Sequence, residues 1–341
     1  MRGSWKKLRL RRMLHAAKQF LIYCKHFDPR IAWIQFWECL TSDSHGYSDY
    51  YIESMSKLMQ KKLKPIIKRY QQTDTVQLNS PIHDFHGKKP VWVCWWQGEE
   101  AMPDAVKICY RRIRKAFDGE DFAVVLITDE NYQEYIEFPQ IILERRRQGA
   151  IGYAHFADIL RWALVASYGG VWLDTCFYLT YDSADHIAEQ LSYPFFTQRY
   201  QDKSECPNEP SRGLWVNGFF MGNRGSKVRI FQFVYDCLLF YWTKYDRAFH
   251  YVFLDYILWA GYQTIPDIRQ LIDNVPPNNQ DFWGLWGMMD SPYREDVWNE
   301  KMGRCDLYKL TYKKNWREYD EDGSITFWGK LKQTELPETD R

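Results

Sequence analysis

The sequence lacks most features of a membrane-spanning, secreted or nucleic-acid-binding protein. None of its 341 residues belongs to an apolar run of about 18, so no transmembrane helix is expected. The N-terminus has no apolar segment followed by a small-residue cleavage site, so no signal peptide is expected. The net charge of +1 gives no electrostatic sign of nucleic-acid binding. We therefore expect a cytoplasmic protein with no nucleic-acid partner.

Cysteine patterns are missing as well. The chain has 8 cysteines, but they are scattered and none forms a CxxC pair. This excludes the spacings of a zinc site and gives no disulfide framework. Several cysteines lie in apolar runs, such as Cys94 in VWVCWW, which is typical of buried free thiols in a reducing compartment.

Aromatic residues are abundant, at 18% of the chain with 16 tryptophans. Their flat apolar faces and polar edges suit sugar rings and nucleotide bases, but they suit a tryptophan-rich core equally well. Composition alone leaves both interpretations open.

Residues 1–80 are expected to form a basic, helical extension. The first 26 residues are rich in Lys and Arg, with no acid before Asp28, and their apolar residues recur at roughly helical spacing. A basic amphipathic helix could lie on an anionic membrane surface, whereas the alternative is a solvated helix packed on the domain. Residues 31–75 continue as helices with a break at Pro65, and a polar linker leads to Pro90.

After Pro90, short apolar runs alternate with helical patterns. VWVCWW (91–96) and FAVVLIT (122–128) predict strands, and AVKICYRRIRKAF (105–117) predicts a helix between them. Short helices are expected in NYQEYI (131–136) and PQIILERRRQ (139–148). This alternation predicts a mostly parallel sheet with helices on its faces. Ligands of such sheets bind at the carboxyl ends of strands, where strand order reverses.

The most informative stretch runs from residue 153 to residue 180. Its apolar spacing predicts a helix over 153–168, which Gly169-Gly170 ends, followed by the buried strand VWLD. Asp158 and Arg161 lie on this apolar helix and form either a structural salt bridge or part of a ligand site. Asp174 ends the strand, where a carboxylate can ligate Mg2+ or Mn2+ or simply form a turn.

Together these residues resemble a known family. ADILRWALVASYGGVWLDTCFYLT (157–180) resembles the signature of the capsular polysaccharide synthesis glycosyltransferases. More distantly, it is similar to the initiating outer-chain mannosyltransferases of yeast and the large clostridial glucosylating toxins. VWVCWWQG (91–98) matches the first strand of the group, and KLTYKK (309–314) and FWGKL (327–331) match its ending. The resemblance spans 88–331 and leaves 332–341 as a polar tail.

The resemblance implies an α/β fold of the GT-A (Rossmann-like) type, with a mixed, mostly parallel sheet flanked by helices. It also implies a UDP- or GDP-sugar donor and a Mn2+ or Mg2+ cofactor. It would place Trp95 or Trp96 at the base, Asp158 and Arg161 at the sugar and ribose, Asp174 on metal and diphosphate, and Thr175 at the cofactor.

One position departs from the family pattern. Cys176 replaces the second Asp of the Asp-x-Asp motif, and a thiol is a poor ligand for a hard divalent ion. Water, Asp182 or a C-terminal side chain would have to complete the metal site.

The second half of the chain adds a candidate acid. HYVFLDYILWAGY (250–262) predicts an apolar helix in which Asp255 is either a functional acid with a raised pKa or a hydrogen-bonded structural carboxylate. In related transferases a helix acid here faces the acceptor. Asn217, Gly218 and Asn223 could meet acceptor hydroxyls, although turn geometry suits the glycine better. DFWGLWGMMDSPY (281–293) suggests a lid or an ordinary packed loop.

We therefore expect a retaining, metal-assisted hexosyltransferase that moves a sugar from a nucleotide-sugar donor to a hydroxyl of a capsular glycan or lipid-linked oligosaccharide. It would lie at the inner face of the cytoplasmic membrane through its basic N-terminal helix. The first alternative is a non-catalytic sugar-nucleotide or glycan-binding relative, motivated by Cys176. The second is a glycoside hydrolase that uses Asp174 and Asp255 as its two carboxylates.

Overall fold

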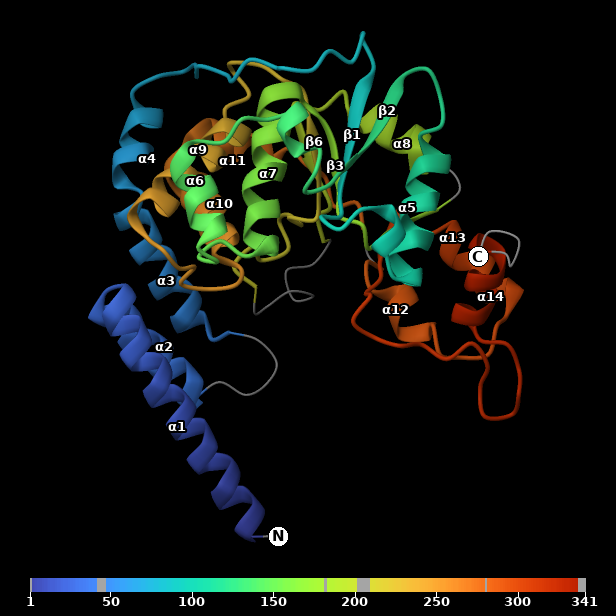
Figure 1. Ribbon diagram of the computed structural model, residues 1–341, viewed down its shortest axis with the longest axis horizontal. Helices are drawn as coiled ribbons and strands as arrows, with labels where there is room; N and C mark the ends of the chain where they lie inside the picture. Colours follow the sequence, from blue (N-terminus) through green and yellow to red (C-terminus); the bar gives the residue numbers. More distant parts are fainter. Residues whose placement is uncertain (1, 42–46, 181–182, 201–208, 280, 337–341) are drawn as a thin grey trace.

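The computed structural model describes residues 2–41, 47–180, 183–200, 209–279 and 281–336, and Figure 1 shows its arrangement. Its centre is a five-stranded sheet with the strand order β2-β1-β3-β6-β5. The strands are β1 (Lys89–Cys94), β2 (Phe122–Ile127), β3 (Gly170–Leu173), β5 (Phe195–Thr197) and β6 (Phe219–Gly222). Strands β1, β2, β3 and β5 run in one direction, and β6 runs in the opposite direction between β3 and β5. The expected mixed, mostly parallel α/β fold is confirmed, and it is compatible with a GT-A (Rossmann-like) fold.

The path of the chain through the sheet creates a point where strand order reverses. From β1 the chain passes through α5 (Asp104–Ala116) to the edge strand β2. It then returns through α7 (Tyr153–Tyr168) to β3, which pairs with the other side of β1. Because β1 and β3 are parallel, the residues after Cys94 and after Leu173 lie at the same edge of the sheet, where ligands of such sheets bind.

Gly169, directly after α7, and Gly170, the first residue of β3, allow the chain to turn tightly from the helix into the sheet. Gly169 has φ +74° and Gly170 has φ +89°, a region that favours glycine. A Cβ on Gly170 would lie 2.2 Å from the carbonyl oxygen of Pro90 at the start of β1. The Gly-Gly turn therefore does more than end the helix, because it lets β3 lie against β1.

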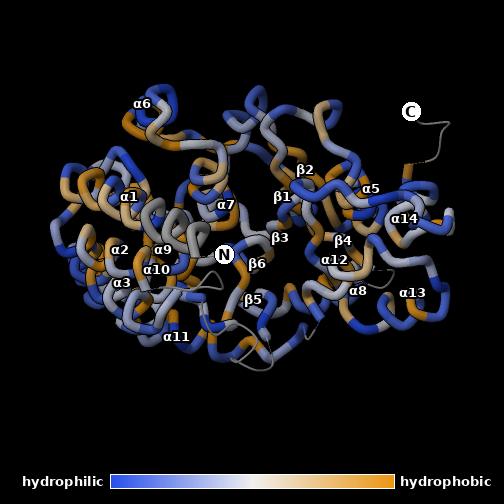
Figure 2. Tube along the Cα trace, turned by 90° about the horizontal axis from the view of Figure 1, so that it is seen from below, coloured by the Kyte–Doolittle hydropathy of each residue, from blue (hydrophilic) through white to orange (hydrophobic). Residues whose placement is uncertain are grey.

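Helices cover both faces of the sheet, as Figures 1 and 2 show from two directions. One side carries α7 with α6 (Gln140–Arg147), α9 (Ile230–Lys244), α10 (Phe253–Thr264) and α11 (Pro266–Asp273). The other carries α5, α8 (Ser183–Gln190), α12 (Gly284–Met288), α13 (Glu295–Met302) and α14 (Phe327–Glu335), beside the two-stranded ribbon of β4 (Phe177–Leu179) and β7 (Leu307–Lys309). This second side has its own smaller apolar core.

The N-terminal helices are α1 (Arg2–His26), α2 (Pro29–Thr41), α3 (Asp49–Lys62) and α4 (Lys64–Gln71). The predicted break at Pro65 is confirmed, since α4 begins with this proline in its first turn. Helix α1 packs on α2 and projects from the body of the molecule (Figure 1), whereas α3 packs against α10. No helix in the described part of the chain is long and apolar enough to cross a membrane.

One expected helix is shorter than predicted. In NYQEYI only a 3-10 turn forms, over Tyr132–Glu134. Pro139 follows closely and disfavours helical backbone in the residue before it, so a helix begun at Tyr132 has no room to continue.

Candidate functional site

A two-part cleft opens at the carboxyl edge of β1 and β3, where the strand order reverses. A larger cavity of about 580 Å³ is lined by residues after β1 and by the segment after β7. A smaller cavity of about 250 Å³ is lined by α7, α10 and the loop before β6. The lining residues that both cavities share are Ala154, Arg161, Asp174, Tyr251 and Lys309. The two cavities are therefore halves of one cleft, which meet at a group of charged side chains.

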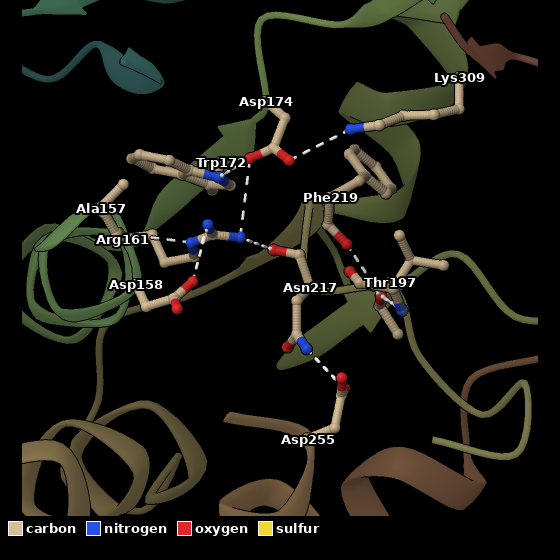
Figure 3. Close-up of polar contacts among 11 residues, drawn as sticks. Ala157, Asp158, Arg161, Trp172, Asp174, Thr197, Asn217, Phe219, Asp255 and Lys309 are labelled. Carbon is tan, nitrogen blue, oxygen red and sulfur yellow. Dashed lines mark hydrogen bonds and ion pairs between the residues drawn. The ribbon is translucent and has the colours of Figure 1, made fainter. Parts of the chain in front are cut away.

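Asp174, the residue after β3, lines both cavities, and Figure 3 shows its polar contacts. Its Oδ1 accepts a hydrogen bond from Trp172 Nε1 at 3.0 Å and lies 3.6 Å from an Arg161 guanidinium nitrogen. Its Oδ2 accepts a hydrogen bond from Lys309 Nζ at 3.2 Å. Burial raises the pKa of Asp174, but the Lys309 and Arg161 cations outweigh this and leave the pKa below its ordinary value. Asp174 is therefore a charged, doubly paired carboxylate.

Arg161 connects Asp174 to the other acids of the cleft. Its guanidinium lies 2.9 Å from Asp158 Oδ1, donates to the backbone oxygen of Asn217 at 2.6 Å and covers the ring of Trp172 at 5.3 Å. Burial raises the pKa of Asp158, against the opposing effect of Arg161. The pair forms the salt bridge that one interpretation expected, and it also lines the cleft, as the other required.

Asp255 lies on α10 and lines the smaller cavity. Its Oδ1 accepts hydrogen bonds from Trp215 Nε1 at 2.8 Å and from Asn217 Nδ2 at 2.5 Å. Burial raises its pKa to about 7, although these two hydrogen bonds oppose the rise. Asn217 connects Asp255 to Arg161 and its acidic partners, since its backbone oxygen accepts a hydrogen bond from Arg161 and its side chain donates one to Asp255 (Figure 3). The helix acid predicted from the sequence is thus tied to the charged centre.

The structure separates the roles of Trp95 and Trp96. Trp96 is buried, donates from Nε1 to the backbone oxygen of Tyr153 at 3.1 Å, and carries the Arg146 guanidinium 4.6 Å from its ring. Trp95 lies edge-on to Tyr312 in the wall of the larger cavity. Its buried Nε1 has no hydrogen-bond partner within the described residues. Trp95 therefore contributes its ring to the cavity wall, whereas Trp96 is tied by its Nε1 to the backbone of α7.

Two site features were missed by the sequence reasoning. Lys309 contacts Asp174, and the only signal was the KLTYKK segment, which was matched to the family without a role. Gly218 was expected to serve a turn. In the structure a Cβ on Gly218 would lie 2.6 Å from Asp174 Oδ2, so this glycine makes room for the carboxylate. Asn223, in contrast, donates to the backbone oxygen of Leu191 and lines neither cavity.

A comparison with protein families agrees with the motifs. The profile of the family described as capsular polysaccharide synthesis protein matches residues 45–330. The chain belongs to this family. The resemblance seen in residues 157–180 is thereby confirmed, and the match also includes α3 and α4. Comparisons with curated proteins and with solved structures gave no match.

The residues of this capsular polysaccharide synthesis protein do not fit the expected Mn2+ or Mg2+ well. Both oxygens of Asp174 are already paired. Two partly buried unit charges about 4 Å apart interact by about 4 kcal/mol, so the repulsion between the Lys309 ammonium and a divalent ion at that distance would be twice as large. Burial raises the pKa of the Cys176 thiol, which keeps it neutral. No group of three His, Cys, Asp or Glu in the described part of the chain could hold a metal, and Asp182 lies outside that part.

The remaining predicted site residues border the cleft. Thr175 is buried in the wall of the larger cavity. In the 281–293 segment, Leu285 and Met289 are buried in the smaller core, while Trp283 is 46% exposed and reaches the smaller cavity. The segment is thus anchored beside the cleft through the short helix α12, and both Phe282 and Trp283 line the smaller cavity.

Proposed function

We propose that this protein is a glycosyltransferase that moves a sugar from a UDP- or GDP-sugar to a hydroxyl of a growing capsular glycan or lipid-linked oligosaccharide. The observation that carries the proposal is the two-part cleft, which has its cations where its halves meet. A glycosyl donor needs one pocket for its nucleotide and another for the acceptor, with the reacting bond between them. Membership of a capsule synthesis family supports the same reaction class.

The larger cavity would bind the nucleotide. Trp95 and Tyr312 offer aromatic faces for the base. Arg161 and Lys309 would neutralise the diphosphate at the junction of the cavities, where negative charge develops as the donor bond breaks.

The smaller cavity would bind the acceptor. Asp255 lines this cavity and would accept hydrogen bonds from the hydroxyls of a sugar, and Trp283 offers an apolar face. We propose retention of configuration, with no enzymic nucleophile and with the departing phosphate oxygen taking the acceptor proton.

The exposed basic hairpin of α1 and α2 would bring the enzyme to membrane-bound acceptors. Side chains that support contact with an anionic lipid surface are exposed on both helices: Arg12, Met13, Leu14, Lys18, Leu21, Lys25, Trp33 and Trp37. Basic charge and exposed aromatic rings are the chemistry of an interfacial anchor.

The deciding experiment is a thermal shift assay with UDP and GDP, followed by a screen of UDP- and GDP-sugars for hydrolysis and transfer. A nucleotide whose free concentration is 100 times its dissociation constant stabilises the folded protein by about 2.7 kcal/mol. Stabilisation by one nucleotide together with turnover of its sugar supports the proposal. Failure of both nucleotides to stabilise the protein contradicts it.

One second candidate has an observation in its favour. The buried neutral thiol of Cys176 stands where a second carboxylate is expected, which suits a relative that binds sugar nucleotides without turning them over. Binding without hydrolysis or transfer of any tested sugar would favour that candidate. A glycoside hydrolase would bind neither nucleotide, so the same assay separates it.

A further inference from the structure

Lys309 reaches Asp174 through the pairing of two short strands. Strand β4 starts three residues after Asp174, and its Phe177 pairs with Lys309 in the antiparallel partner β7. The backbone nitrogen of Leu310 also donates to the Cys176 oxygen at 2.8 Å. The position of the lysine is therefore set by backbone hydrogen bonds on both sides of it, and not by a flexible loop.

The side chain of Lys309 is held as firmly as its backbone. Its Nζ lies 3.2 Å from Asp174 Oδ2 and 4.4 Å from the centroid of the Phe177 ring, and the side chain is only 21% exposed. An ammonium carries three N–H donors, of which Asp174 uses one. The group is thus a fixed, partly desolvated positive charge at the junction of the two cavities.

Asp174 binds two protein cations at once, because Arg161 approaches Oδ1 while Lys309 approaches Oδ2. An Asp at the end of a strand is expected to expose its oxygens to a divalent ion, but here a lysine occupies that side. Lys313, which is exposed and lines the larger cavity, adds a further positive charge from the same segment.

We propose that Lys309, together with Arg161, takes the place of a divalent metal ion and binds the diphosphate of the donor, so that this protein works without metal. The inference rests on the proposed glycosyltransferase function and deepens it. Asp174 positions the Lys309 ammonium between the two cavities, and the bound diphosphate shares that ammonium.

The bonds, electrons and proton of the transfer step can all be accounted for without a metal ion. The bond between the anomeric carbon and the diphosphate oxygen breaks, and its electron pair stays on that oxygen beside Lys309. The acceptor hydroxyl oxygen forms the new bond to the anomeric carbon, and its proton passes to the departing diphosphate. The products are the glycoside and a nucleoside diphosphate, and the lysine stabilises the charge that develops on the leaving group.

The first arm of the test uses the unaltered protein. Its affinity for UDP and GDP is measured by calorimetry in excess EDTA and again in MnCl2 or MgCl2. We expect the better nucleotide to bind equally in all three conditions, within roughly 3-fold, which is about 0.65 kcal/mol. A loss of tenfold or more in EDTA would overturn the inference.

The second arm uses Lys309→Met, which keeps the length of the side chain and removes its charge. We expect nucleotide affinity in EDTA to fall roughly 10- to 100-fold, and Lys309→Arg to recover most of it. Lys314→Met is the matched control, because Lys314 pairs with Asp290 and lines neither cavity. Unchanged affinity of Lys309→Met, with a melting transition like that of the parent, would overturn the inference.

The outcomes separate this inference from the function on which it rests. Nucleotide binding that appears only with Mn2+ or Mg2+ would keep the glycosyltransferase proposal and refute the metal-independent site. Absence of nucleotide binding in every condition would refute both. If Lys309→Met fails to fold, the EDTA comparison on the parent protein still decides.

Discussion

Lys309 and Asp174 stand 135 residues apart in the chain, yet the Nζ of one lies 3.2 Å from the Oδ2 of the other. The contact joins the end of a central strand to a two-stranded ribbon on the far side of the sheet. It gives the cleft a cation at the junction of its two cavities, and it makes the carboxylate a charged partner of protein groups. The properties of Asp174 therefore depend on a residue that no local motif contains.

Asp174→Asn should abolish activity while preserving the fold. The amide cannot pair with Lys309 and Arg161 as a carboxylate does, so both cations lose their orientation. We expect nucleotide-sugar turnover to fall by roughly 100-fold or more, with an unchanged far-UV circular dichroism spectrum. Asp290→Asn is the control, since Asp290 pairs with Lys314 and lines neither cavity. Retained turnover in Asp174→Asn would contradict its placement in the donor site.

Asp255→Asn should stabilise the protein at neutral pH. Burial raises the pKa of Asp255 to about 7, against about 3.9 in an unfolded chain. The folded state then binds the extra proton, so the parent loses stability as pH rises from about 4 to about 7. The difference in melting temperature between the variant and the parent should therefore grow as pH rises over this range. The transfer activity of the variant should be lower than that of the parent.

The control for this pH series has the opposite sign. Desolvation raises the pKa of Asp290, but the hydrogen bonds from Lys314 and from the Arg317 backbone, together with the positive charges of these two residues, outweigh it and leave the pKa lowered. Its carboxylate contributes stability above the unfolded pKa, so Asp290→Asn should melt earlier than the parent at neutral pH. A difference between Asp255→Asn and the parent that does not vary with pH would show that Asp255 titrates normally.

Trp95→Phe and Trp96→Phe should fail in different assays. The first reduces the aromatic surface that lines the larger cavity, so nucleotide affinity should fall roughly 3- to 10-fold at unchanged melting temperature. The second removes the hydrogen bond to Tyr153 and weakens the stacking of Arg146, so unfolding should become easier by about 1–2 kcal/mol. Calorimetry measures the nucleotide affinity of both variants, and denaturant unfolding measures their stability. A loss of stability in Trp95→Phe and a loss of affinity in Trp96→Phe would contradict the roles assigned to the two residues.

Gly170→Ala should destabilise the fold strongly. Its φ of +89° disfavours any Cβ, and that atom would lie 2.2 Å from the Pro90 carbonyl oxygen. We expect a loss of at least about 2 kcal/mol in the free energy of unfolding. Gly119→Ala is the matched control, because a Cβ there meets nothing within 4 Å, and it should change stability by less than about 0.5 kcal/mol. Urea unfolding measures both.

Replacing Trp33 and Trp37 by Ser should weaken binding to anionic membranes. These side chains are 56% and 50% exposed on α2 and would enter the lipid interface. We expect partitioning into phosphatidylglycerol vesicles to fall roughly tenfold. Trp286→Ser, at an exposed position on α12, should leave it unchanged. Equal binding of the parent to phosphatidylcholine and phosphatidylglycerol vesicles would contradict the electrostatic part of the proposal.

The local structure around the cleft was largely predictable. Helix α7 has the bounds that apolar spacing predicted, and the strand predicted in VWLD forms as β3 but ends at Leu173, one residue before Asp174. These predictions succeed because the spacing of apolar residues along the sequence indicates whether a helix or a strand would bring them together on one buried face. The helix predicted over 131–136 forms only as a 3-10 turn over Tyr132–Glu134, a limit that apolar spacing does not show.

The sequence by itself determined the elements, the family and the acids that face a cleft, because each depends on neighbours within one helix, strand or motif. Only the tertiary structure decided that Lys309 pairs with Asp174, that Trp96 donates to the backbone of Tyr153, and that Asn217 connects Arg161 to Asp255. These relationships arise from strand pairing and helix packing between distant segments. Apolar periodicity shows which face of an element is buried, but it does not identify the segment that covers it.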